Sequence, residues 1–235
     1  MRAASLRAAI VIAAVAALAV PVWAQDAAGS GSVGSGAQGA DPVFEVDYTN
    51  PSLSPSHWTM TLHPDGRGHF RSEVGTARTR GIEAPGVDRD FQVSAAYAGH
   101  VFEVVRQHHW FMAPCDAHTH EKVAFQGWKR FSYGGPEGKG TCEFNYAKDQ
   151  KIDALSESLG AVASTMVEGA RLESLLVHDR LGLDEEMEYL VEAARDGRVQ
   201  QMETIRGILE RLVEDDKVMD RVRQRARELL ALSQT

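Results

Sequence analysis

Histidines concentrate in one stretch of this chain, together with other side chains that can bind a metal ion. Five of the nine histidines lie from position 100 to position 120, and a cysteine and two carboxylates accompany them. Imidazole, thiolate and carboxylate groups are common ligands of zinc, and imidazole also binds copper. The segment from His108 to His120 therefore predicts a Zn or Cu site, with His109, His118 and His120 as candidate ligands.

The same segment has other interpretations, because its spacing matches no known zinc motif. His118-Thr119-His120 followed by Glu121 differs from the H-E-x-x-H pattern of zinc hydrolases. A solvated histidine-rich loop, or histidines at a protein interface, would have the same composition. A metal-dependent hydrolase that uses this segment is the alternative function, although no catalytic residue can be named, since the chain has no G-x-S-x-G or other complete nucleophile motif.

The first residues predict an export signal. Arg2 and Arg7 supply a positively charged start, residues 8–20 form an apolar run, and small residues precede a cleavage site after Ala24. We therefore expect residues 1–24 to be removed and the protein to be periplasmic or secreted. A proline and a polar, glycine-rich segment end the apolar run early, so no stable membrane span is expected after signal removal.

The chain has only two cysteines, Cys115 and Cys142. In an exported chain an even pair of cysteines predicts a disulfide. The predicted alternation of the strand that carries Cys142 turns its side chain inward, which suits a structural cross-link. A disulfide and a thiolate metal ligand would compete for the same sulfur atom of Cys115.

A second candidate site is aromatic. Trp128, Arg130, Phe131 and Tyr133 lie close together on a predicted strand. Aromatic and arginine side chains on an exposed strand face or edge favour protein binding. The alternative is that the aromatic rings pack in the core of the domain.

The charge of the chain excludes some classes of partner. Its formal net charge is −8 at pH 7. Nonspecific binding to nucleic acid or to anionic membranes needs clustered lysines and arginines, so neither is expected. The expected partner is another exported protein; the sequence does not predict the oligomeric state.

Strand and helix signals alternate in the first half of the globular sequence. Residues 57–72 alternate in polarity on both sides of Pro64-Asp65-Gly66, which predicts a β-hairpin. Ser94 is a candidate N-cap of a helix that ends near Trp110. Two strands, 122–133 and 141–146, then predict a second hairpin with a longer, glycine-rich loop.

The C-terminal third has helical periodicity. One apolar face runs from Ile152 to Met166, and Gly169 interrupts it before it resumes in a shifted register, which indicates a bend or a long helix that changes partner. Three further helices follow, as antiparallel hairpins with short turns. The fold class is α+β, with two antiparallel β-hairpins and an intervening helix, followed by an antiparallel helical region. The expected parts are a signal peptide (1–24), a flexible Gly/Ser/Ala-rich leader (25–42), an α+β part (43–148) and a helical part (149–235) that packs with it or forms its own domain.

The order of these elements resembles a known family. The Pro64-Asp65-Gly66 turn, the helix end at Trp110-Phe111, and Phe131-Ser132-Tyr133 followed by a glycine turn, a strand and a helix resemble emfourin-type inhibitors of secreted metalloproteases. The resemblance covers about half of the chain. It implies a small α+β inhibitor domain, but no inhibitory residue can be carried over, and the C-terminal helices and the histidine-rich segment depart from the pattern.

Together these patterns predict a noncatalytic exported module that binds another protein or has a structural role. Metal binding through the histidine segment, with or without hydrolysis, is the alternative.

Overall fold

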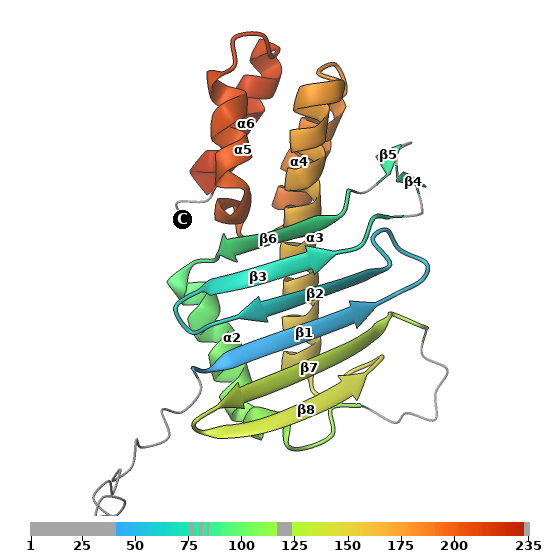
Figure 1. The fold of residues 1–235 in the computed structure, drawn as a ribbon, viewed down its shortest axis with the longest axis vertical. Coiled ribbons are helices and arrows are strands. Elements are labelled where there is room, and N and C mark those ends of the chain that lie inside the picture. The colour runs from blue at the N-terminus through green and yellow to red at the C-terminus, as the bar shows by residue number, and fades with distance from the viewer. Residues whose placement is uncertain (1–40, 76–77, 80–81, 84, 117–123, 233–235) are drawn as a thin grey trace, which may run out of the picture. The chain divides into compact units, whose positions relative to one another are not determined.

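Six antiparallel strands form one sheet, whose order is β6-β3-β2-β1-β7-β8 (Figure 1). This computed structural model describes residues 41–75, 78–79, 82–83, 85–116 and 124–232. The predicted signal peptide and nearly all of the predicted leader lie outside these residues. The strands are β1 (Val43–Thr49), β2 (His57–Leu62), β3 (Arg67–Ser72), β6 (Val87–Gln92), β7 (Trp128–Gly135) and β8 (Gly138–Phe144), with a separate short pair, β4 (Arg78–Thr79) and β5 (Ile82–Glu83).

The two predicted hairpins are present, but they belong to a single sheet. β2 pairs with β3, and β7 pairs with β8, each antiparallel. Strand β1, which the sequence analysis did not identify, pairs with β2 on one side and with β7 on the other. The α+β class is confirmed, and β1 is the element that joins the hairpins.

The second hairpin has a tighter turn than predicted. β7 continues to Gly135 and β8 begins at Gly138, so only Pro136 and Glu137 lie between the strands. The glycines interpreted as a loop are strand residues, and at Gly140 the backbone of η3 passes very close. A Cβ atom on Gly140 would lie 2.3 Å from the carbonyl oxygen of Trp110.

Helix α2 (Ala95–Gln107) begins where predicted, since the Ser94 side chain accepts a hydrogen bond from the amide of Tyr97 at 3.2 Å. It ends three residues earlier than expected. The chain then turns through the short helix η3 (His109–Phe111), whose three residues have left-handed φ angles of 49°, 55° and 59°. This conformation costs non-glycine residues about 1–2 kcal/mol each, and burial of the Phe111 ring against Phe44 and Phe131 offsets that cost.

Helix α3 (Gln150–His178) is the longest element and packs in both parts of the core. It begins at the Asp149 cap and crosses behind the sheet in Figure 1. Residues up to Ala170 pack in a cluster with the sheet, and residues from Leu172 pack in a second cluster with the later helices. Of the two predicted alternatives, the structure has the long helix that changes partner. Gly169 lies at the change, where an added Cβ would lie 2.3 Å from the Ile205 side chain.

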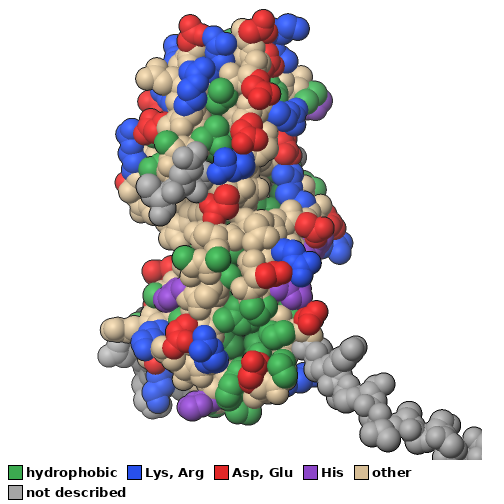
Figure 2. Space-filling view, turned by 90° about the vertical axis from the view of Figure 1, so that its left-hand side faces the viewer, with side chains coloured by type: hydrophobic (Ala, Val, Ile, Leu, Met, Phe, Trp, Pro, Cys, Tyr) green, Lys and Arg blue, Asp and Glu red, His purple; other side chains and the backbone are tan. Residues whose placement is uncertain are grey.

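The remaining helices pack on the second half of α3 and form one compact unit, Ala40–Thr235, with the sheet. They are α4 (Leu183–Arg195), η4 (Met202–Ile205), α5 (Arg206–Glu214) and α6 (Asp220–Leu232). Polar contacts also join the two halves: Arg89 forms a bidentate pair with Glu173, and the buried Thr165 hydroxyl donates to the carbonyl of Gln200 at 2.7 Å. Acidic and basic side chains are interspersed over these helices on the face shown in Figure 2. None of the helices in the described residues is long and apolar enough to cross a membrane.

The close approach of η3 to β8 predicts that Gly140→Ala destabilises the protein. The new methyl group would collide with backbone atoms that cannot move independently, so we expect a loss of about 1–3 kcal/mol in the free energy of unfolding, measured by urea denaturation. Gly134→Ala in the neighbouring strand is the control, because no atom lies within 4 Å of its added Cβ, and it should change stability by less than about 0.5 kcal/mol. Equal effects of the two substitutions would contradict this account of Gly140.

Candidate functional site

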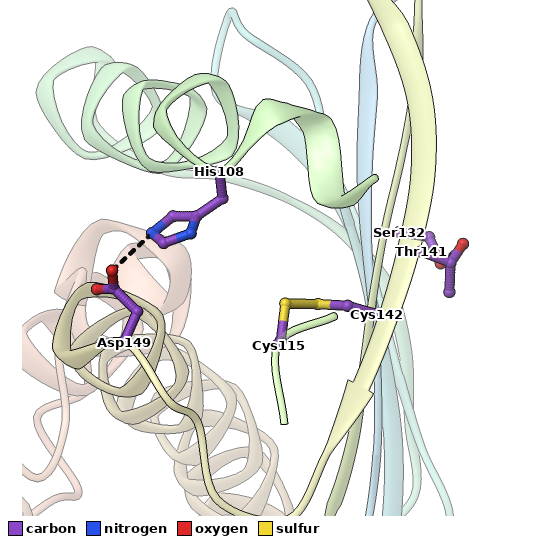
Figure 3. Close-up of a disulfide and its surroundings, with 6 residues drawn as sticks. All are labelled: His108, Cys115, Ser132, Thr141, Cys142 and Asp149. Atoms are coloured by element: carbon purple, nitrogen blue, oxygen red, sulfur yellow. Dashed lines mark hydrogen bonds and ion pairs between the residues drawn. A yellow bond between two sulfur atoms is a disulfide. The ribbon is translucent and has the colours of Figure 1, made fainter. Parts of the chain in front are cut away.

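The predicted disulfide is present. Cys115 and Cys142 are bonded with a Cα–Cα distance of 5.6 Å, and both side chains are buried. Figure 3 shows Cys142 on the helix-facing side of the sheet and Thr141 on the opposite side, as the predicted alternation requires. Cys115 therefore offers no thiolate to a metal ion.

The structure brings only part of the histidine segment together. His108 caps the end of α2, and its Nε2 lies 3.8 Å from a carboxylate oxygen of Asp149, the cap of α3 (Figure 3). His109 is exposed, and together with His108 and Asp149 it lines a pocket of about 310 Å³. His118 and His120 lie outside the described residues. Within the described ranges, no three His, Cys, Asp or Glu side chains are arranged to hold a metal ion, so the Zn or Cu site stays a prediction.

The disulfide closes a loop between residues that are 27 positions apart in the sequence. We expect the double substitution of both cysteines by alanine to lower the free energy of unfolding by about 3–4 kcal/mol, because the unfolded chain loses the constraint. Urea denaturation of this variant and of the oxidised protein measures the difference. A loss below about 1 kcal/mol would show that the cross-link does not support the fold.

Two other histidines lie on the solvent-facing side of the sheet. His57 contacts the carboxylates of Asp47 at 3.0 Å and Glu73 at 3.2 Å, and His69 contacts those of Asp88 and Asp90. These contacts link neighbouring strands and stabilise the polar face. His69 and its two partners are exposed, whereas His57 and Asp47 are half-buried.

The predicted aromatic surface is divided between the two faces of β7. Trp128 is 57% exposed and Arg130 is exposed, where it pairs with Glu143 at 2.6 Å. Phe131 and Tyr133 are buried, because side chains alternate along a strand and these two face the helices. Placing all four on one binding surface is therefore wrong; only Trp128 and Arg130 can belong to it.

A cleft that the sequence analysis missed lies between α3 and the sheet. Two adjoining cavities, of about 310 and 280 Å³, share five lining residues and together follow α3 from Asp153 to Arg171. The shared residues are Tyr48, Leu53, Trp58, Gly160 and Ser164. At 1.5 Å per residue, this part of the helix is about 27 Å long, which makes the cleft an extended groove.

Aromatic rings from two neighbouring strands line the sheet side of the cleft. Tyr48 and Trp58 are directly opposite in the β1–β2 pairing, and their rings stack with centroids 5.2 Å apart. The Tyr48 hydroxyl donates to the carbonyl of Gln126, which fixes the ring. Gly127 has a φ of +99° and lies so close to this ring that a Cβ would lie 2.7 Å from it. The aromatic wall is therefore preformed.

The β1–β2 loop forms one rim of the cleft. Asn50 holds this loop closed. Its backbone N–H donates to the carbonyl of Ser56 at 2.7 Å, and its side-chain Oδ1 accepts from the backbone N–H of Ser52. Leu53, at the tip, is 49% exposed and lines both cavities. An exposed leucine on a preformed rim supplies apolar surface to a bound molecule.

Small side chains line the α3 side of the cleft. Gly160 lies at the middle of the wall, and a Cβ built on it would meet no atom within 4 Å. Glycine inside a helix costs about 1 kcal/mol relative to alanine, and the packing of the fold does not require it here. Ser164, one turn further along, is exposed and also lines both cavities. The space over Gly160 is thus open to a ligand.

Lys129 lies at one end of the cleft. It is directly opposite Tyr48 in the β1–β7 pairing, and it is only 7% exposed. Its Nζ donates to the carbonyl of Asn145 at 3.1 Å and lies 5.6 Å from the centre of the Phe144 ring. Burial lowers the pKa of this ammonium group, and the charges of Asp153 and Glu157 partly oppose that shift.

Arg171 lies at the other end and is 2% exposed. Its Nη1 is 3.5 Å from a carboxylate oxygen of Glu168 and 3.7 Å from one of Glu186. Nε and Nη1 make no hydrogen bond within the described part of the chain. Both nitrogen atoms are buried, so the guanidinium is part of the wall of the cleft.

The cleft offers stacked rings, an apolar rim and buried cations, which are features of a recognition site. No protein-family model and no curated protein sequence matches this chain. The resemblance to emfourin-type inhibitors therefore stays a prediction.

Lys129→Met should change the pH dependence of stability. Burial places the folded-state pKa of Lys129 below its ordinary value of 10.5. As the pH rises towards 10.5, the folded protein therefore loses the Lys129 proton before the unfolded chain does, and the unfolded chain holds more protons than the folded one. The wild-type protein should thus gain stability relative to the variant across that window. Tyr97 and Tyr133, whose pKa values are raised to about 12 by burial, titrate in both proteins and cancel in the difference.

Urea denaturation of both proteins at intervals from pH 7 to pH 10.5 measures this difference. A stability difference that does not change with pH would contradict the buried position of the ammonium group.

Proposed function

We propose that this protein is an exported, noncatalytic module and that its cleft binds an extended segment of a partner protein. The observation that carries the proposal is the groove along α3, of about 27 Å, with its stacked Tyr48–Trp58 wall and the open space over Gly160. This length exceeds that of most small ligands. It matches about eight residues of extended chain, at 3.3–3.6 Å per residue.

An exposed aromatic pair also supports a protein partner. Phe125 and Trp128 are 50% and 57% exposed and form an edge-to-face pair. Trp128 is on the solvent-facing side of β7 and does not line the cleft, so the pair is a separate patch; exposed aromatic side chains are typical of protein interfaces. The disulfide supports the exported location, because such bonds persist in oxidising compartments.

Two glycine substitutions test the proposal. Gly160→Leu places a side chain in the cleft where an added Cβ meets no atom. Gly99→Leu is the matched control, because Gly99 is also inside a helix, α2, is exposed to solvent, and has no atom near its added Cβ. Both variants should fold, since leucine has a higher helix propensity than glycine.

Each variant is used to capture exported proteins from the cell of origin, and binding is measured against increasing partner concentration. We expect saturable binding by the wild-type protein and by Gly99→Leu, and at least a tenfold loss for Gly160→Leu. Saturable binding that survives in Gly160→Leu would place the interface elsewhere. Absence of any saturable partner would contradict the protein-binding function.

A further inference from the structure

The charges that line the cleft differ in how far a ligand can reach them. Both cations, Lys129 and Arg171, are buried and contact groups of the protein itself. Among the acids, Glu157 is exposed and Asp153 is half-buried, and both line the Lys129 end of the cleft. A molecule that enters this end therefore meets carboxylates first.

The two carboxylates are placed at a cost to the helix. Asp153 and Glu157 are four residues apart on α3, so they are neighbours on the helix surface, and like charges at this spacing are destabilising. Within the described residues, neither has a basic nitrogen within 4 Å, although the buried ammonium group of Lys129 interacts with both charges from a greater distance. Asp153 is in the first turn, where the helix dipole favours an acid, but Glu157 is beyond it. A cationic ligand group would relieve the repulsion.

The aromatic wall favours the same kind of group. The stacked rings of Tyr48 and Trp58 line the same cavity as Asp153 and Glu157. Lysine and arginine side chains are attracted to the faces of tyrosine and tryptophan rings, more strongly where water is excluded. Arginine is also flat, so it can lie against a ring while its N–H groups reach a carboxylate.

The Arg171 end disfavours an anionic ligand group. Two glutamates, Glu168 and Glu186, lie within 4 Å of the guanidinium and more than balance its charge. The Nε and Nη1 atoms are themselves buried, so a bound segment does not reach them. This end of the cleft therefore does not oppose the binding of a basic segment.

Building on the proposed function, we propose that the cleft recognises a basic residue, lysine or arginine, in the bound segment. The basic side chain lies against Tyr48 and Trp58, with its charge directed to Asp153 and Glu157.

Three eight-residue peptides, identical except for arginine, glutamine or glutamate at the centre, test this inference with the protein purified after export. Calorimetric titration should give an affinity for the arginine peptide at least tenfold above that for the glutamate peptide. Glu157→Gln should reduce the preference for arginine over glutamine severalfold. The control Glu192→Gln, at an exposed position of α4, should leave it unchanged. Raising the salt concentration from 50 to 300 mM should markedly weaken the binding of the arginine peptide and of no other peptide.

The outcomes separate this inference from the proposed function. Equal affinities for the three peptides, abolished by Gly160→Leu, would overturn the preference for a basic residue and leave the cleft as a peptide site. Tighter binding of the glutamate peptide, or no binding of the arginine peptide at millimolar concentration, would also overturn the preference. The proposed function itself fails only if the Gly160→Leu variant still binds the natural partner protein with unchanged affinity, or if the wild-type protein has no saturable partner.

Discussion

One helix has to bury itself against two different surfaces, and the rest of the structure depends on how α3 meets that constraint. Its first half packs on the sheet, and its second half packs on α4, α5 and α6. Gly169 lies at the crossover, where the Ile205 side chain occupies the space that a Cβ would need. Because a continuous hydrogen-bonded helix is shared by both clusters, neither part can be removed without exposing apolar residues of α3 to water.

The cleft is a consequence of the same arrangement. Helix α2 and the sheet-side half of α3 cover one face of the sheet, but small side chains on α3 leave space opposite Tyr48 and Trp58. The hydrogen-bonded β1–β2 loop forms one rim of that space. The binding site is thus formed between elements that the core already holds in place, so little ordering is needed when a ligand binds.

Local signals in the sequence predicted local structure well. The Pro64-Asp65-Gly66 turn, the Ser94 cap and the disulfide each depend on a few nearby residues or on a single pair. Strand β1 was missed although β2 follows it directly; its other partner, β7, is distant in sequence. The turn after Tyr133 was misjudged because a close backbone approach, rather than loop flexibility, explains Gly140. The cleft could not be predicted, since it combines residues from β1, β2, β7 and α3 that carry no common motif. One signal was available: Gly160 lies inside a predicted helix, where glycine is less favourable than alanine.

Native-state hydrogen exchange along α3 tests the central claim that this helix joins the sheet and the later helices into one cooperative unit. The amides of Leu159, in the sheet cluster, and of Leu176, in the helical cluster, should exchange with the same free energy of opening, close to that of global unfolding. If the Leu176 amide opens at a clearly lower free energy while Leu159 remains protected, the two parts unfold separately and α3 is not the shared element described here.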